Sequence, residues 1–393
     1  DRFLDEGRAL PLLRQLAGLG VRLCPQDGGA LREDTGMLVL STAVEAENPE
    51  RVRAKVLGIP ERHRAEVLAD CCRRGPLLAV AGTSGKTTCT GWLGRVLEVC
   101  GLDPNVVNGG GVLDWKSDLR PGNVRLADPA HPWVVEVDES DRSLLKFFPE
   151  VAMISTLSAD HHDLAETLRL FRQFASQVRR TVVCGPGVRA ALEGTPGLTA
   201  ALVEVSEALP SHLPGAHNGW NAAMVAEMAV ACGVSRAAAV AALRAFSGVE
   251  RRLQQTGAGV YDDYAHNPEK IAAAMAAVRR AGGRLHVVWR PHGFAPLRQN
   301  FAAFVETFVQ GLGPEDWLGV LPVFYAGGTV SKGQQSGDLV TAVAAAGRRA
   351  ELLPAYPETL PLAAEDVLLV MGARDPELPE FAARMGRQRM QAG

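Results

Sequence analysis

The residues best suited to chemistry lie in one short segment, Gly82-Thr83-Ser84-Gly85-Lys86-Thr87-Thr88. Glycines allow backbone N–H groups to approach phosphate oxygens, the lysine neutralises phosphate charge, and a hydroxyl can reach a magnesium ion. An apolar run at 77–80 precedes this segment, and a helical pattern at 89–99 follows it. Strand, glycine loop and helix in this order predict an ATP site. Val80 occupies the position of the standard motif's first glycine, so a glycine turn with an incidental lysine is the alternative.

Two further polar groups follow apolar runs that we expect to be strands. Glu136 lies near the end of one Val-rich run, and His161 comes shortly after the next. If these strands are parallel neighbours, both side chains lie at the same sheet edge as the phosphate loop. Together with Thr87, a carboxylate and an imidazole suit a divalent ion such as Mg²⁺, with phosphate oxygens and water completing its shell. A solvated acidic run and a helix cap at Asp160 are the other explanation.

The elements that position these residues alternate along most of the chain. Short Val- and Leu-rich runs are followed by Ala-rich segments whose apolar residues recur at helical spacing, which predicts βαβ units and an α/β fold with parallel sheets. We expect strands at 37–40, 77–80, 134–137, 151–154, 181–184, 286–289 and 367–370. We expect helices at 89–99, 220–231, 236–246, 268–281 and 301–310. Turn residues at 73–76 and 257–259 suggest hinges, so we place domain boundaries near 75 and 255.

Composition excludes several classes of protein. A length of 393 residues suggests two or three domains. The net charge of −3 and the scattered basic residues argue against a nucleic-acid partner. Apolar runs fall far short of the roughly 20 residues that a bilayer requires, and the polar N-terminus does not resemble a signal peptide. The seven cysteines show no paired spacing and are expected to be reduced thiols. We therefore expect a cytoplasmic protein.

The loop GTxGKTT after a strand resembles that of the Mur ligase family, which makes amide bonds in bacterial cell-wall precursors. Other motifs of this family occur in the family's order between residues 37 and 376, on both sides of the loop. They are Ser41-Thr42-Ala43-Val44, Asn48-Pro49-Glu50, Gly58-Ile59-Pro60, Asp138-Glu139-Ser140-Asp141, Gly215-Ala216-His217-Asn218, Phe246-Ser247-Gly248-Val249, Asp263-Tyr264-Ala265-His266, Arg290-Pro291-His292 and Met371-Gly372-Ala373. The likeness is strongest to members that join an amino acid such as L-alanine to a UDP-N-acetylmuramate-like acceptor.

This resemblance implies a three-domain architecture. We expect an N-terminal domain of the UDP-substrate type at 1–75, a central P-loop ATPase domain at 76–255, and a Rossmann-like amino-acid-binding domain at 256–393. The first domain is expected to be incomplete, because the chain begins downstream of the family's glycine-rich diphosphate loop.

The resemblance also implies roles for individual residues. Lys86, Arg252 and His161 correspond to catalytic groups of the family, and Thr87, Glu136 and His161 to metal ligands. Asn218 and Asn221 correspond to nucleotide-binding residues, with Asn218 at the adenine and Asp263 at the ribose. Tyr264, His266, His292 and Arg298 are expected to bind the amino substrate. From the residues alone, a helix cap at Asn218 and packing roles for the tyrosine and histidines stay open.

The expected activity is an ATP-dependent amide ligation through an acyl phosphate, with ATP and Mg²⁺ as cofactors and small molecules as substrates. Three departures from the family pattern leave the substrates open: Ser84 replaces a histidine, and Gly293 and Pro296 replace two arginines. The alternatives are a ligase that attaches a whole peptide to UDP-muramate, a P-loop kinase or ATPase, and a non-catalytic nucleotide-binding relative. The oligomeric state stays open.

Overall fold

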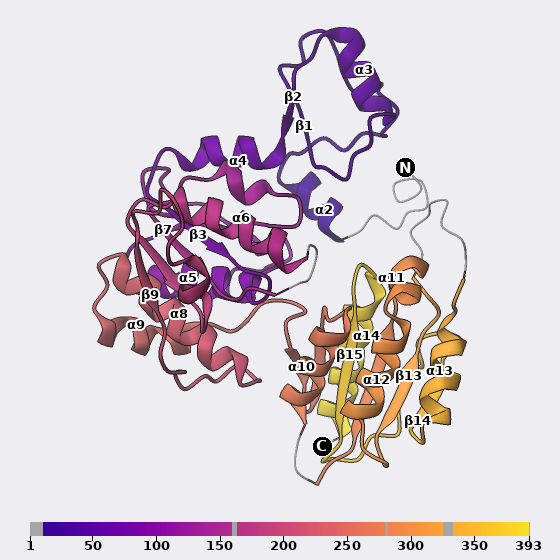
Figure 1. Cartoon of the computed structure of the whole chain (residues 1–393). Helices are drawn as coiled ribbons and strands as arrows, with labels where there is room; N and C mark the ends of the chain where they lie inside the picture. The colour runs from indigo at the N-terminus through magenta and orange to yellow at the C-terminus, as the bar shows by residue number, and fades with distance from the viewer. Residues whose placement is uncertain (1–10, 159–162, 280–281, 325–332, 393) are drawn as a thin grey trace. The chain divides into compact units, whose positions relative to one another are not determined.

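The computed structural model describes residues 11–158, 163–279, 282–324 and 333–392 (Figure 1). The chain forms two compact units. Unit 1 comprises the chain up to Ser211 together with Gly219–Gly248, and unit 2 comprises His212–Asn218 together with the chain from Val249 onwards. Each unit contains one large, mainly parallel sheet flanked by helices, so the predicted α/β class is confirmed.

The sheet of unit 1 has seven strands in the order β5-β4-β6-β3-β7-β8-β9, and all neighbours are parallel except β4 and β5. The strands are β3 (Leu77–Ala81), β4 (Asn105–Val107), β5 (Val124–Arg125), β6 (Trp133–Glu136), β7 (Val151–Ile154), β8 (Thr181–Cys184) and β9 (Ala201–Glu204). Because β6 and β7 flank β3, the loops that follow all three strands meet at one edge.

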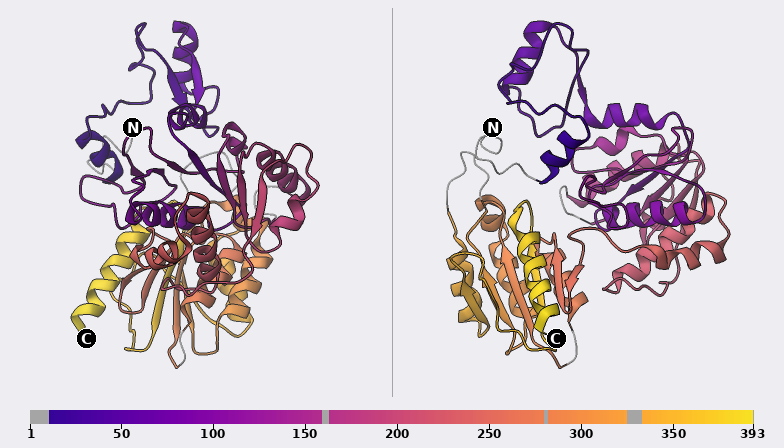
Figure 2. Two further views of the ribbon diagram at one scale, coloured as in Figure 1. Left: turned by 90° about the vertical axis from the view of Figure 1, so that its left-hand side faces the viewer. Right: turned by 180° about the vertical axis from the view of Figure 1, so that it is seen from behind.

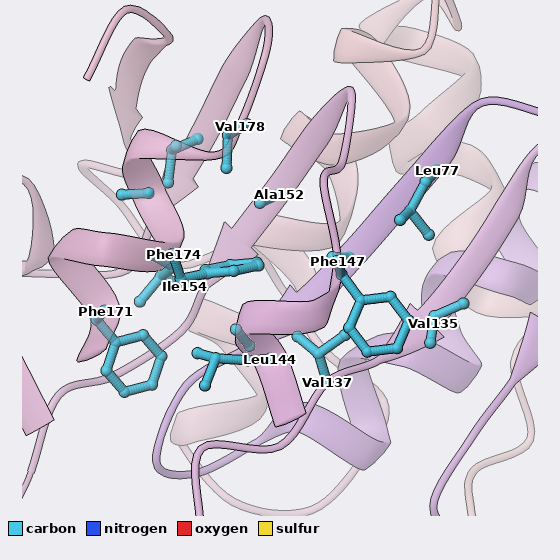
Figure 3. Close-up of a cluster of buried hydrophobic side chains, with 14 of the residues drawn as sticks. Leu77, Val135, Val137, Leu144, Phe147, Ala152, Ile154, Phe171, Phe174 and Val178 are labelled. Atoms are coloured by element: carbon cyan, nitrogen blue, oxygen red, sulfur yellow. The ribbon is translucent and has the colours of Figure 1, made fainter. Parts of the chain in front are cut away.

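Helices cover both faces of this sheet. Alternate residues of β3, Leu77 and Ala79, pack in a buried cluster with Phe171 and Phe174 of α6 (Figure 3). This face is covered by α4 (Arg64–Cys72), the 3₁₀ turn η1 (Ser143–Lys146), α6 (Leu164–Ser176) and α7 (Val188–Leu192). The helix α5 (Lys86–Val99) contacts β3, β4 and β6 but contributes nothing to that cluster, so it covers the opposite face. Its neighbours include α9 (Arg236–Ala242) and η2 (Leu243–Ala245).

The N-terminal part of unit 1 contains a small parallel pair of strands. These are β1 (Leu38–Leu40) and β2 (Glu61–His63), joined by α3 (Pro49–Leu57), and α2 (Pro11–Gly18) precedes them. Asn48 caps α3 by accepting the Glu50 N–H, and Gly58 ends it in a left-handed conformation with φ 68°. The cap and the glycine explain the length of this helix.

The sheet of unit 2 has six strands in the order β10-β11-β15-β12-β13-β14, parallel except for the β10–β11 hairpin. The strands are β10 (Gln254–Gly257), β11 (Val260–Asp263), β12 (Leu285–Arg290), β13 (Trp317–Val320), β14 (Arg349–Leu352) and β15 (Val367–Gly372). One face packs on α10 (Pro268–Val278), α12 (Phe301–Gly311) and α13 (Ser336–Ala345), and the other on α14 (Glu377–Ala392). Figure 2 shows α14, in yellow, on one side of the strands and the orange helices on the other.

Several expectations differ in detail. The expected helix 236–246 ends in the 3₁₀ turn η2, and the segment 257–259, expected to be a hinge, is the turn of the β10–β11 hairpin. All seven expected strands are present, with ends shifted by at most two residues. The domain boundaries at 75 and 255 stay a prediction. In the described ranges, no helix has both the length and the apolar character needed to span a membrane.

Candidate active site

The phosphate loop lies between β3 and α5, as predicted. Gly82 has φ 134° and a Cβ there would collide with the Ser155 side chain, while Gly85 has φ 81°. Any side chain at Gly85 would also lie against Asn221, whose Oδ1 is 3.0 Å from the Cβ position. Gly82 is therefore required by conformation and by space, and Gly85 by conformation. Gly85 is the N-cap of α5 and provides no side-chain cap, so the first N–H groups of the helix are available to an anion.

Hydroxyl groups from the loop after β7 hold the phosphate loop in place. The Thr83 hydroxyl lies 3.0 Å from that of Thr156 and 2.9 Å from that of Ser158. The Ser84 N–H donates to the Thr156 hydroxyl at 3.0 Å, and the Ser155 hydroxyl donates to the Ser84 carbonyl. Because β7 is hydrogen-bonded to β3, these contacts fix the loop to the sheet. They preorganise its N–H groups for phosphate oxygens.

Lys86 lies over the loop in a partly buried acidic setting. Its ammonium donates to the Gly82 carbonyl at 2.8 Å and to Glu139 Oε2 at 2.6 Å, and Asp138 Oδ1 is 3.6 Å away. Glu139 is 2% exposed, and burial raises its pKa although Lys86 opposes the shift. For Asp138, burial acts to raise the pKa, but Lys86 and Ser140 outweigh it, so the pKa lies below its ordinary value. These contacts hold the Lys86 ammonium at the position where phosphate charge would be placed.

Glu136 and Thr87 meet beside the loop. The Thr87 hydroxyl donates to Glu136 Oε1 at 2.9 Å, and the Gly109 N–H donates to Oε2 at 2.7 Å. A hydroxyl and a carboxylate are hard oxygen donors, so this pair fits a magnesium ion that also binds phosphate oxygens and water. His161, the third predicted ligand, lies outside the described residues. Within the described ranges, no cluster of three or more histidine, cysteine or acidic side chains could hold a metal by itself.

The two predicted nucleotide-binding asparagines lie on α8 (His217–Ala231). They are one turn apart and therefore share a helix face. Asn221 is 6% exposed and lies against Gly85 of the phosphate loop, whereas Asn218 is 5% exposed and donates to the Pro214 carbonyl at 2.7 Å. The bond to Pro214 fixes the Asn218 amide at the start of the helix. Its predicted contact with adenine is not tested by this geometry.

In unit 2, the predicted residues gather where the parallel strands end. Asp263, the last residue of β11, accepts the N–H groups of Leu253 and Ala265, both at 2.7 Å. Burial raises the pKa of Asp263, and Arg252 opposes the shift. The guanidinium carbon of Arg252 lies 5.3 Å from the centre of the Tyr264 ring. Asp263 therefore stabilises the turn that carries Tyr264, while each of its oxygens keeps a lone pair for a ligand hydroxyl.

The remaining predicted substrate residues are partly brought together. The rings of His266 and His292 meet edge to face at 5.0 Å, and Tyr264 meets His266 at 5.5 Å. Burial, and then the charge of Arg374, lower the pKa of His292. Arg298 lies on the short helix α11 (Phe294–Gln299), against Gly333. The structure thus unites the tyrosine and both histidines, while among the described residues Arg298 lies against Gly333 and forms no hydrogen bond or ring contact with them.

Several residues of these sites were not predicted from the sequence. In the sequence Glu139 is only one member of an acidic motif, and its pairing with Lys86 depends on the fold. The hydroxyls of Thr156 and Ser158 also follow β7 and carry no local signal. In unit 2, the buried Asp262 pairs with Arg251, with 3.3 Å between Oδ2 and Nε. Two aspartates in succession at the end of an apolar strand are the signal in the sequence.

Comparisons with known proteins agree with these observations. A family model described as "Mur ligase, glutamate ligase domain" matches residues 249–374, and one described as "Mur ligase family, catalytic domain" matches residues 9–75. A UDP-N-acetylmuramate--L-alanine ligase of Gloeobacter violaceus is 35% identical over 338 residues, which cover 77% of this chain and 71% of that protein. The protein of the same name from Paenarthrobacter aurescens is 33% identical, and the match covers 93% of this chain and 87% of that one.

Solved structures show the same fold. The UDP-N-acetylmuramate-alanine ligase of Thermotoga maritima aligns with a TM-score of 0.76 at 23% identity, over 97% of this chain and 91% of that one. A murein peptide ligase of Psychrobacter arcticus aligns with a TM-score of 0.63 at 18% identity, over 97% and 91%. The resemblance seen in the sequence is therefore confirmed, and the chain belongs to the Mur ligase family.

Proposed function

We propose that this protein is an ATP-dependent ligase that joins the carboxylate of a UDP-N-acetylmuramate-like acceptor to an amino acid such as L-alanine, in peptidoglycan precursor synthesis. The observation that carries the proposal is the loop 82–88, where Lys86 lies over the loop and Thr87 donates to Glu136 at the same sheet edge. Relatives that share a third of their residues over most of the chain are named for this reaction. The names of these relatives indicate the substrates, and the geometry of the loop supports the transfer of a phosphoryl group from ATP.

The reaction proceeds in two displacements. An acceptor carboxylate oxygen attacks the γ-phosphorus of ATP, an O–P bond forms, and ADP leaves. The amine then attacks the acyl carbon, loses a proton, and expels phosphate, which carries away the former carboxylate oxygen. The Lys86 ammonium neutralises charge on the transferring phosphoryl group, and the N–H groups of the loop orient it. Arg252 supplies a second cation in this proposal, because a guanidinium matches phosphoryl oxygens.

Magnesium completes the proposed site. Thr87 and Glu136 are the described residues that would hold it, and His161 is the further ligand that the sequence predicts. When bound, the ion neutralises phosphate charge and orients the phosphate chain. Asn218, Asn221 and Asp263 are proposed to bind the nucleoside, and Tyr264, His266, His292 and Arg298 the amino substrate. We also propose the domain boundaries near 75 and 255, which the sequence and the family resemblance predict.

A product assay tests this function. The purified chain is incubated with ATP, Mg²⁺, UDP-N-acetylmuramate and single amine donors, and both phosphate and amide product are measured. An acceptor labelled with ¹⁸O in its carboxylate should transfer label to phosphate, because the acyl phosphate breaks at the carbon–oxygen bond. Amide product with labelled phosphate is the expected result. Absence of amide product with every donor would contradict the ligase function.

The donor panel also separates the related reaction. The fold is shared with murein peptide ligases, so the panel includes a peptide donor beside L-alanine and other amino acids. A preference for the free amino acid is expected here. A strong preference for the peptide would instead assign the chain to peptide ligation.

A further inference from the structure

The carboxyl edge of the unit 2 sheet places two side chains beside each other. Arg290 of β12 and Gly372 of β15 are partners in the parallel ladder. The strands approach so closely here that a Cβ on Gly372, where φ is 148°, would lie 2.7 Å from the Arg290 carbonyl oxygen. Two residues beyond this pair lie His292, after β12, and Arg374, after β15. The two side chains therefore emerge from neighbouring strands at the same edge.

Most of the cations at this edge already have carboxylate partners. Arg251 pairs with Asp262, and Arg290 Nη1 pairs with Asp375 Oδ2 at 2.5 Å. Arg374 is exposed, and none of the carboxylates in the described parts of the chain forms an ion pair with it. Burial is the main cause of the lowered pKa of His292, and the positive charge of Arg374 is the second cause. Arg374 is thus a cation beside the histidines with no partner of its own among the described residues.

The backbone of Arg374 is also unusual. Its φ is 64°, in the left-handed region that glycine adopts without strain and that other residues rarely occupy. A glycine would satisfy the turn at lower conformational cost, so the turn does not explain the arginine. We therefore attribute the presence of arginine at this position to a function of its side chain.

The neighbouring imidazoles determine what Arg374 can bind. A histidine whose pKa is lowered is mainly neutral at neutral pH, so His292 adds little positive charge. Arg374 is then a cation beside His292 that can attract an anion. A guanidinium binds a carboxylate through two parallel hydrogen bonds. An amino acid has one carboxylate, together with the amine that must react.

We propose that Arg374 binds the carboxylate of the amino donor, next to His292 and His266. This inference rests on the ligase function proposed above. It restricts the donor to molecules with a free carboxylate near the reacting amine, such as α-amino acids. Arg374 acts in binding, so its removal should affect the KM for the donor more than kcat.

The test compares a donor with its amide. Wild-type protein and the Arg374→Gly variant are assayed with L-alanine and with L-alaninamide, which lacks the negative charge. Glycine suits φ 64°, so the variant should keep or raise the midpoint of thermal unfolding. Loss of a charged hydrogen bond should raise the KM for L-alanine by roughly 10- to 100-fold. The KM for L-alaninamide should stay unchanged, and Arg374→Lys should recover part of the preference.

The control is Arg387→Ala, which removes an exposed arginine from α14 of the same unit. It should leave the KM for L-alanine unchanged. Equal losses with L-alanine and L-alaninamide, or a KM change for ATP alone, would overturn the inference. If wild-type protein forms no amide with any donor, the proposed function fails instead. If it forms amide and Arg374→Gly keeps the full preference for L-alanine, only the role of Arg374 is wrong.

Discussion

Lys86 and Glu139 form a pair whose two members have different purposes. In the proposed function the ammonium binds phosphate, while the Glu139 carboxylate holds it in place, with 2.6 Å between Nζ and Oε2. Lys86→Ala should lower the rate of phosphoryl transfer at least roughly 100-fold, because a preorganised charge at the reacting group is lost. It should also destabilise unit 1, by about 3–5 kcal/mol for an unpaired buried carboxylate. Steady-state phosphate release and urea unfolding measure the two effects.

A double variant separates these effects. Glu139→Gln in the Lys86→Ala background removes the unpaired negative charge, so most of the lost stability should return. The activity should not return, because no cation faces the phosphate. If the double variant recovers activity, Lys86 is not the phosphate-binding cation.

The sequence predicts single residues well only where their signal is local. The phosphate loop is contiguous, and its glycines, lysine and threonines were all predicted from spacing. Glu136 was predicted from its place at a strand end, and it does meet Thr87. Glu139 and Thr156 act through tertiary contacts with residues 53 and 73 positions away. No local pattern could indicate those partners.

At the scale of elements, the turn from β3 into α5 depends on close approach. Gly82 has a left-handed φ of 134° and faces the Ser155 side chain and the N–H groups of Ser155 and Thr156. Gly82→Ala should therefore displace the loop from β7 and weaken ATP binding, while the strained backbone alone should cost about 1–3 kcal/mol of folding stability. Calorimetry with a non-hydrolysable ATP analogue measures the change. Gly101→Ala is the matched control, because Gly101 has φ 84° but open space around it.

A normal affinity in Gly82→Ala would show that the loop tolerates a side chain. The control should keep ATP affinity while losing a similar amount of backbone stability. A loss of ATP affinity that occurs in Gly82→Ala but not in Gly101→Ala therefore results from displacement of the phosphate loop.

The end of β11 should respond to pH. Asp262 is fully buried, and burial raises its pKa to about 6, although Arg251 opposes the shift. A folded-state pKa above the unfolded value of 3.8 means that the folded state binds more protons between these values. The stability gained from that proton is present at low pH and is lost as pH rises through about 6. Arg251 offsets the charge that then appears.

Arg251→Ala should therefore have a pH-dependent cost. At about pH 8 the Asp262 carboxylate is charged and unpaired, and the sheet should lose about 3–5 kcal/mol. At about pH 5 the carboxyl group is protonated, and the loss should be much smaller. Hydrogen exchange of the β11 and β15 amides measures this in the affected sheet. An equal loss at both pH values would mean that Arg251 acts through its bond to the Gly372 carbonyl and not through charge.

Elements with strong apolar patterns were predictable, and short polar ones were not. The strands β3, β7 and β8 are buried on both faces and consist mainly of apolar residues, so they read as continuous apolar runs. By contrast, β5 (Val-Arg) and β10 (Gln-Gln-Thr-Gly) owe their pairing to neighbouring strands. A hairpin turn and a linker have the same composition, so Gly257 and Gly259 predict a hinge from the sequence although they form the β10–β11 turn.

At the scale of the molecule, composition and alternation were sufficient for the α/β class, but not for the path of the chain. Unit 2 includes the separate segment His212–Asn218, which lies between two stretches of unit 1. A boundary search along the sequence looks for contiguous domains and cannot find such an insertion. The helix α8 begins in this segment and continues into unit 1. Predicted nucleotide ligands therefore belong to both units.

This division yields a final prediction. Binding of an ATP analogue with Mg²⁺ at 100 times its dissociation constant should stabilise the protein by about 2.7 kcal/mol. Hydrogen exchange should show protection of the loop 82–88 and of β3 in unit 1. If Asp263 and Arg252 also bind the nucleotide, the amides of Leu253 and Ala265, which donate to Asp263, should be protected as well. The double variant Lys86→Ala/Glu139→Gln should abolish both responses. Protection confined to unit 1 would contradict the predicted roles of Asp263 and Arg252 and leave the phosphate site intact.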